Sequence, residues 1–130
     1  MDSGGIRRRL ALGAAVLAAS GMLALVTSGT AQAGTGGGCA GPEVRALPFS
    51  TGVTHVYKSD GYVCAVTVAR NPGSAQTMSV SVQARGSRPV VDTGIYRHHA
   101  GPVTVHAGHR CVWVKGAVGG GSVSKGWILC

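Results

Sequence analysis

The chain has 130 residues, a formal net charge of +8, 45% hydrophobic residues and 12% charged residues. This length corresponds to about one domain, and it excludes a two-domain enzyme and a polytopic membrane protein. The apolar fraction excludes a disordered chain, and the 22 glycines do not follow the every-third-residue period of collagen.

The first 33 residues contain the three parts of a secretory signal peptide. Arg7-Arg8-Arg9 form a positive start, an apolar run extends from Leu10 to Val26, and Ala31-Gln32-Ala33 matches a cleavage site. The run is 17 residues long, at the short limit of the roughly 17–25 residues that span a bilayer. We therefore expect cleavage after Ala33 and a secreted protein without a membrane span. An uncleaved anchor and export by the twin-arginine route are the alternatives.

After residue 33 we expect a Gly-rich flexible leader at 34–38 and a single domain at 39–130. This part contains nine Lys and Arg residues and three acids, a formal charge of +6, together with all four cysteines and all five histidines. Secreted domains of this size commonly gain stability from disulfides, because their hydrophobic cores are modest.

Alternation of apolar and polar side chains with a period of two dominates this domain. The clearest strand is Met78–Ala84, followed by Tyr62–Ala69, Pro102–His106 and Cys111–Lys115, with weaker candidates at Gly52–Lys58 and Ser122–Cys130. Turn signals separate these runs at 59–61, 71–73, 85–87, 100–102, 107–109 and 119–121. About seven short strands at this spacing predict an all-β fold, a small antiparallel sandwich or barrel.

The stretch Met78–Gln83 is uncharged, β-prone and free of Pro. These properties favour a central strand of the sheet. The alternative is an exposed edge strand that supports self-association.

The four cysteines, Cys39, Cys64, Cys111 and Cys130, allow three disulfide pairings. We favour Cys39 with Cys64 and Cys111 with Cys130, since the terminal position of Cys130 suits a bond that holds the last strand. In the loop-entropy description each bond is worth about 3 kcal/mol. A zinc site is disfavoured because no C-x-x-C spacing occurs.

The C-terminal half carries a pattern that resembles the spore-associated protein A family of small secreted actinomycete proteins. The matching segments are Asp92–Tyr96, Ala100–Val103, Cys111–Trp113, Gly116 and Cys130. The block Tyr57–Arg70 around Cys64 also resembles the family's second-cysteine strand. The family tends to have an aromatic residue where this chain has His99.

The resemblance implies export and association with the spore surface or aerial growth, and it brings no known catalytic residues. We expect a secreted, non-catalytic structural or coating protein of the cell or spore surface. Its expected partners are spore or cell-wall components, with self-association as an addition. The alternative is a soluble cationic binding module, either a wall-polymer binder or a protease inhibitor.

The residues offer little for catalysis, and we expect no enzyme activity and no cofactor. Only Glu43, Asp60 and Asp92 are acidic, and all three lie beside turn-type residues, where solvated or turn-capping roles are common. No G-x-S-x-G motif occurs, and an even number of cysteines in an exported chain argues against a free thiolate.

The histidines are the sharpest local feature, since His98, His99, His106 and His109 fall within twelve residues. If the chain folds back there, these weak candidates would hold Zn²⁺ or Cu²⁺, or would form a pH-responsive patch. Because they lie in turn regions beside Arg, we favour exposed polar side chains without a metal.

The remaining features concern binding. The cations are spread singly and do not alternate with aromatic residues, which argues against a nucleic-acid partner. The positive charge favours anionic wall polymers or lipid headgroups. We expect Trp113 and Trp127 to pack in the core against a disulfide, with a sugar-stacking platform as the alternative.

Overall fold

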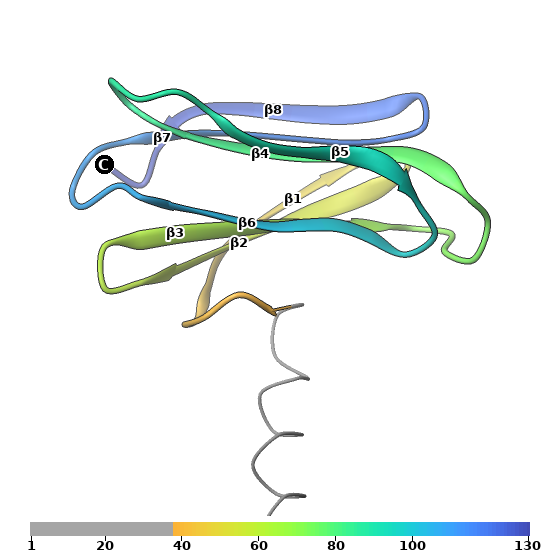
Figure 1. The fold of residues 1–130 in the computed structure, drawn as a ribbon, viewed down its shortest axis with the longest axis horizontal. Coiled ribbons are helices and arrows are strands. Elements are labelled where there is room, and N and C mark those ends of the chain that lie inside the picture. Colours follow the sequence, from red (N-terminus) through yellow and green to blue (C-terminus); the bar gives the residue numbers. More distant parts are fainter. Residues whose placement is uncertain (1–37) are drawn as a thin grey trace, which may run out of the picture. The chain divides into compact units, whose positions relative to one another are not determined.

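A computed structural model describes residues 38–130 (Figure 1). The expected signal peptide at 1–33, and the expected leader up to residue 37, lie outside the described residues. The strands, in chain order, are β1 (Glu43–Phe49), β2 (Gly52–Ser59), β3 (Tyr62–Ala69), β4 (Gln76–Ala84), β5 (Val90–Tyr96), β6 (His99–His106), β7 (Val112–Val118) and β8 (Gly121–Ile128).

The eight strands form two four-stranded antiparallel sheets that lie face to face (Figure 1). Sheet A has the order β1-β2-β3-β6, and sheet B has the order β5-β4-β7-β8. The predicted all-β antiparallel fold is therefore confirmed, as the sandwich rather than the barrel, with eight strands instead of about seven. In residues 38–130, no helix is long and apolar enough to cross a membrane.

The core lies between the sheets and follows from the alternation in the sequence. In β4, Met78, Val80 and Val82 are fully buried, whereas Ser79 and Ser81 between them are only half-buried. The same alternation in the neighbouring strand buries Val112 and Val114. Across the core, sheet A contributes fully buried side chains from Val56, Val63 and Ala65.

Strand β4 pairs with β5 on one side and with β7 on the other. The stretch Met78–Gln83 is therefore a central strand, as favoured from its composition, and it has no free edge. The alternative, that this stretch is an exposed edge strand, is wrong.

Both disulfides have the favoured pairing, Cys39 with Cys64 and Cys111 with Cys130. The first joins the segment before β1 to the middle of β3. The second joins the residue before β7 to the last residue of the chain, just beyond β8.

One predicted turn is wrong, because Ala100-Gly101-Pro102 lies inside β6. Gly101 has φ of +92°, a left-handed conformation that glycine adopts without steric cost, and the register with β3 shifts beside it. This bulge accommodates Pro102 within an edge strand, where the lack of an N–H donor is tolerated.

Candidate functional site

The outer face of sheet A carries a short segment, residues 38–41, that crosses it from β6 to β2. A Cβ at Gly38 would lie 3.2 Å from the ring of Pro102 on β6, and a Cβ at Gly41 would overlap the backbone at Lys58 on β2. Between these points the Cys39–Cys64 disulfide fixes the segment to β3. The crossing is thus built by a covalent bond and by a glycine that lets two backbones touch.

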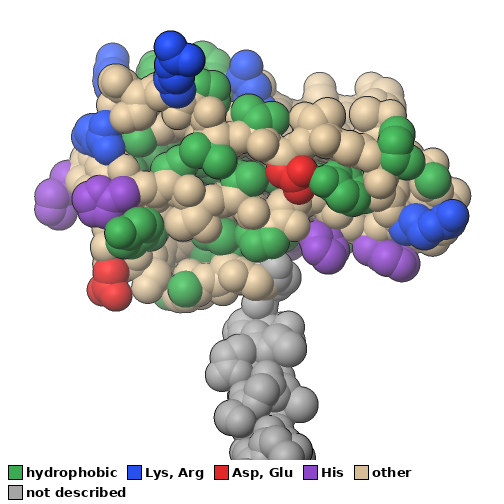
Figure 2. Space-filling model, in the orientation of Figure 1, with side chains coloured by type: hydrophobic (Ala, Val, Ile, Leu, Met, Phe, Trp, Pro, Cys, Tyr) green, Lys and Arg blue, Asp and Glu red, His purple; other side chains and the backbone are tan. Residues whose placement is uncertain are grey.

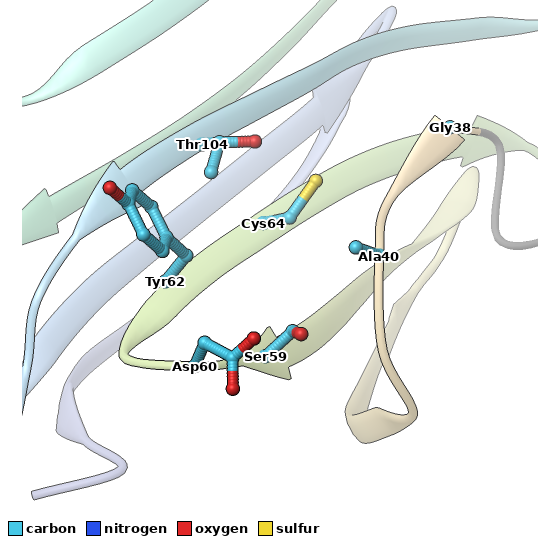
Figure 3. A pocket seen from close by; sticks show the side chains of 7 residues that line it. All are labelled: Gly38, Ala40, Ser59, Asp60, Tyr62, Cys64 and Thr104. Carbon is cyan, nitrogen blue, oxygen red and sulfur yellow. The ribbon is translucent and has the colours of Figure 1, made fainter.

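A hollow of about 290 Å³ lies beside this segment (Figure 3). The figure shows Asp60 and Ser59 at the β2–β3 turn, with Tyr62 and Cys64 on β3, Thr104 on β6 and Ala40 on the crossing segment. Its lining mixes an aromatic ring, hydroxyl groups and one carboxylate.

A second hollow of about 330 Å³ lies on the same sheet, around the other half of β3. Its residues are His55, Tyr57, Val66, Val68, Pro72, His98 and His99. Two valines and a proline give it an apolar lining, and three imidazoles and a phenol add polar groups. Such a combination suits a small amphipathic ligand.

Two polar members of the second hollow interact with Glu43 at the start of β1. His55 Nδ1 lies 2.8 Å from Glu43 Oε2, within hydrogen-bond distance. Burial of the phenol, and then repulsion from the Glu43 carboxylate, raise the pKa of Tyr57 above its ordinary 10.0. Tyr57 is therefore a neutral hydrogen-bonding group at neutral pH.

The four candidate histidines do not come together. His98 and His99 border the second hollow, whereas His106 lies at the opposite end of β6, where its ring packs edge-on against Tyr62 at a centroid distance of 4.8 Å. The ends of an eight-residue strand are about 23 Å apart. In residues 38–130, no group of three or more His, Cys, Asp or Glu side chains is placed to hold a metal ion. His109 is exposed in the β6–β7 loop.

The acidic residues have separate roles. Asp60 lies in the β2–β3 turn, as expected, and Glu43 pairs with His55. Asp92, for which a solvated or turn-capping role was expected, instead lies inside β5. Its Oδ1 accepts a hydrogen bond of 2.6 Å from the Tyr96 hydroxyl, and its Oδ2 accepts one of 2.7 Å from the Gly101 N–H.

The Asp92 contacts explain part of the Asp92–Tyr96 and Ala100–Val103 pattern in structural terms. Tyr96 and Asp92 belong to sheet B, whereas Gly101 belongs to sheet A, so the carboxylate joins the two sheets. A Cβ at position 94 would lie about 3.0 Å from the Tyr96 ring, so a glycine at this position leaves room for that ring. These residues form an inter-sheet clamp.

The prediction that Trp113 and Trp127 pack in the core is wrong, since both side chains are only half-buried. Trp113 alternates with the buried Val112 and Val114 and therefore projects from the outer face of sheet B. Its ring lies against Gly126, it meets Trp127 edge-on at 5.3 Å, and its Nε1 donates a hydrogen bond of 2.8 Å to Ser124 Oγ. The Arg85 guanidinium lies 5.0 Å from the Trp127 ring centroid. These contacts orient Trp113, which is half-buried on the outer face of sheet B.

No pattern in the sequence indicated the second hollow as a site. His55 and Tyr57 look like ordinary members of a weak strand, and His98 and His99, just before and at the start of β6, come more than forty residues later. Only the pairing of Val66 with His55 and of Val68 with His99 brings these segments together.

Comparison of the chain with protein-family models, with curated proteins and with solved structures found no match.

Proposed function

We propose that this protein is secreted and acts, without catalysing a reaction, as a structural or coating protein that adheres to the anionic polymers of a cell or spore surface. The observation that carries this proposal is that the positively charged side chains are not paired with carboxylates. Residues 38–130 contain nine Lys and Arg residues, and none of them forms an ion pair with a carboxylate in this part of the chain.

The three acids do little to balance these cations. Glu43 interacts with His55, and Asp92 accepts hydrogen bonds from within the sandwich. Several arginines donate to backbone carbonyls, for example Arg70 to Phe49 and Arg97 to Gly73, which orients them without neutralising them. A surface with uncompensated positive charge attracts anionic polymers through interactions that salt screens.

The scaffold also suits a long residence outside the cell. Two disulfides hold the segment before β1 and the last residue of the chain, and such bonds persist in oxidising compartments. The resemblance to the spore-associated protein A family supports the spore surface as the location.

Fractionation of a sporulating culture tests the proposal. Washed spores, vegetative mycelium and cell-free medium are blotted for the protein, with and without washes in detergent and in concentrated salt. We expect the protein on spores or mycelium after the detergent wash. Protein that is found only in the medium, at low salt as well, would contradict the proposal.

The alternative, a soluble cationic binding module, is favoured by one observation, the second hollow on sheet A. A small ligand in this hollow would perturb His98 and His99, whose ring signals can be followed by NMR while wall-derived fragments are added. Saturable shifts of these signals, in a protein that is recovered from the medium rather than from spores or mycelium, would favour the binding module over the coating role.

A further inference from the structure

A sandwich of two open sheets has four edge strands, here β1, β6, β5 and β8. Edge strands expose backbone N–H and C=O groups that can pair with another chain, and proteins commonly protect them with Pro, Lys or a bulge. The four edges of this protein differ sharply in that protection.

Three edges are protected. Strand β1 contains Pro48 and a register shift near Arg45. Strand β6 contains Pro102 at its bulge, and β8 contains Lys125 beside a register shift opposite Val112 and Val114. Each of these edges interrupts the regular row of backbone groups that a new strand would need.

Strand β5 has none of these features. It pairs with β4 over seven successive residues without a register shift, and it contains no Pro, Lys or Arg. Its one charged side chain, Asp92, accepts hydrogen bonds from the Tyr96 hydroxyl and the Gly101 N–H. In residues 38–130, no backbone hydrogen bond joins β5 to any strand other than β4.

The same strand is unusually apolar for an exposed edge. Val90, Val91 and Ile95 are 42%, 55% and 67% exposed, and they are three of the five exposed large hydrophobic residues in the described chain. Figure 2 shows hydrophobic side chains spread along the side of the molecule on which β5 and β6 lie. An apolar, regular and unprotected edge favours the addition of a strand.

We propose that β5 is the docking site for a second copy of this chain, through antiparallel pairing of the two β5 strands about a two-fold axis at Thr93. In this register Thr93 lies opposite Thr93 of the second copy, and Val91 lies opposite Ile95 of the second copy on the outer face. The exposed apolar side chains thereby cover one another, and Asp92 lies opposite Gly94 rather than opposite a second carboxylate.

The complementarity of β5 with itself is what identifies a second copy as the occupant. Axes at the neighbouring positions are poorer, since an axis at Asp92 would bring two carboxylates together and an axis at Gly94 would pair Ile95 with Thr93. The contact is also closed, because each copy uses its β5 edge once and the other edges are protected. The proposal therefore predicts a dimer and excludes fibres.

The charges of the chain give this contact a characteristic salt dependence. Arg88 and Arg97 flank β5, and the formal charge of +6 after residue 33 repels a second copy. Salt screens this repulsion and should strengthen the dimer. Adsorption to anionic polymers has the opposite dependence, so the dimer and the proposed function can fail independently.

The test measures the oligomeric state of the full chain, exported by an expressing host and purified as recovered, by sedimentation over a range of concentrations and salt. We expect a monomer–dimer equilibrium that salt shifts toward the dimer. The double variant Val91→Lys/Ile95→Lys places ammonium groups opposite one another and should weaken the dimer by at least about tenfold. The matched control Gly120→Lys/Ser122→Lys adds the same charge at the start of the β8 edge of the same sheet, where nothing lies within 4 Å of the Gly120 Cβ position, and should weaken it much less.

A second double variant tests the register. In Val91→Glu/Ile95→Lys, each new carboxylate would face a new ammonium group of the other copy, so dimerisation should recover relative to the double-lysine variant. Circular dichroism confirms that each variant is folded. A monomer at every concentration, fibres, equal weakening by the β8 control, or failure of the Glu/Lys variant to recover would each overturn the proposal.

Discussion

At Gly116 the two sheets meet across a pair of buried hydroxyl groups. The Oγ1 atoms of Thr54 and Thr67 are 2.7 Å apart, and both side chains are fully buried. A Cβ at position 116 would overlap the Thr54 hydroxyl and lie 2.6 Å from the Thr67 hydroxyl. Because Gly116 has no side chain, β7 can pack directly against the two threonine hydroxyl groups, which form a hydrogen bond with each other.

This contact predicts the effect of Gly116→Ala. The added methyl group must displace a hydroxyl or push the sheets apart, and overpacking of this kind costs about 1–3 kcal/mol of the free energy of unfolding. Gly120→Ala is the matched control, since nothing lies within 4 Å of its Cβ position. Denaturant unfolding compares the two variants, and equal stabilities would contradict the packing described here.

The Asp92 clamp predicts the titration of Tyr96. The hydrogen bond to Asp92, followed by burial and the negative charge of the carboxylate, raises the pKa of Tyr96 above its ordinary 10.0. In Asp92→Asn we expect this pKa to fall toward 10, as followed by NMR of labelled tyrosine rings. Tyr62→Phe, which leaves the clamp intact, should leave the pKa of Tyr96 unchanged.

The raised tyrosine pKa values also fix the sign of a pH effect on stability. The folded chain holds the phenolic protons of Tyr57 and Tyr96 more tightly than the unfolded chain. Their stabilising contribution is thus complete below pH 10 and is lost as the pH rises above 10. Unfolding measured across this alkaline range should show a decline that is smaller in Asp92→Asn, and an unchanged decline would contradict the clamp as its source.

At the scale of the strands, prediction from sequence succeeded where one face of a strand is buried. The alternation in Met78–Ala84 reveals β4 because its inward side chains are fully buried. Strands β1 and β5 were not predicted, since both are edge strands in which only Leu47 is buried, and the residues of β5 do not alternate between apolar and polar. The hollows on sheet A were also not predictable, because they depend on pairing between distant segments.

The disulfides give a prediction at the same scale. They span similar sequence separations of 25 and 19 residues, so the loop-entropy description assigns each about 3 kcal/mol. The variants Cys39→Ser/Cys64→Ser and Cys111→Ser/Cys130→Ser should therefore lose similar amounts of stability in denaturant unfolding. A much larger loss for the first pair would show that packing of the crossing segment on sheet A adds to the entropic effect.

At the scale of the whole molecule, the positive charge is distributed over the described surface rather than gathered in one patch. The cations occur in strands and loops of both sheets, and all of them are exposed except Lys58, which is half-buried. Figure 2 shows Lys and Arg side chains in separate places on the face it presents. A distributed charge of this kind predicts adsorption that depends on the number of cations more than on their positions.

Two double variants of equal charge test this expectation on a surface coated with polyglutamate. Arg45→Gln/Arg88→Gln alters the β1 edge and the β4–β5 loop, whereas Lys115→Gln/Lys125→Gln alters β7 and β8. Because an exposed ion pair contributes up to about 1 kcal/mol, each variant should weaken adsorption by roughly three- to tenfold at low salt. In concentrated salt, the difference in adsorption between each variant and the unmodified protein should disappear. If one variant abolished adsorption and the other had no effect, the contact would be a local patch, and the search for its ligand would move to the residues around that pair.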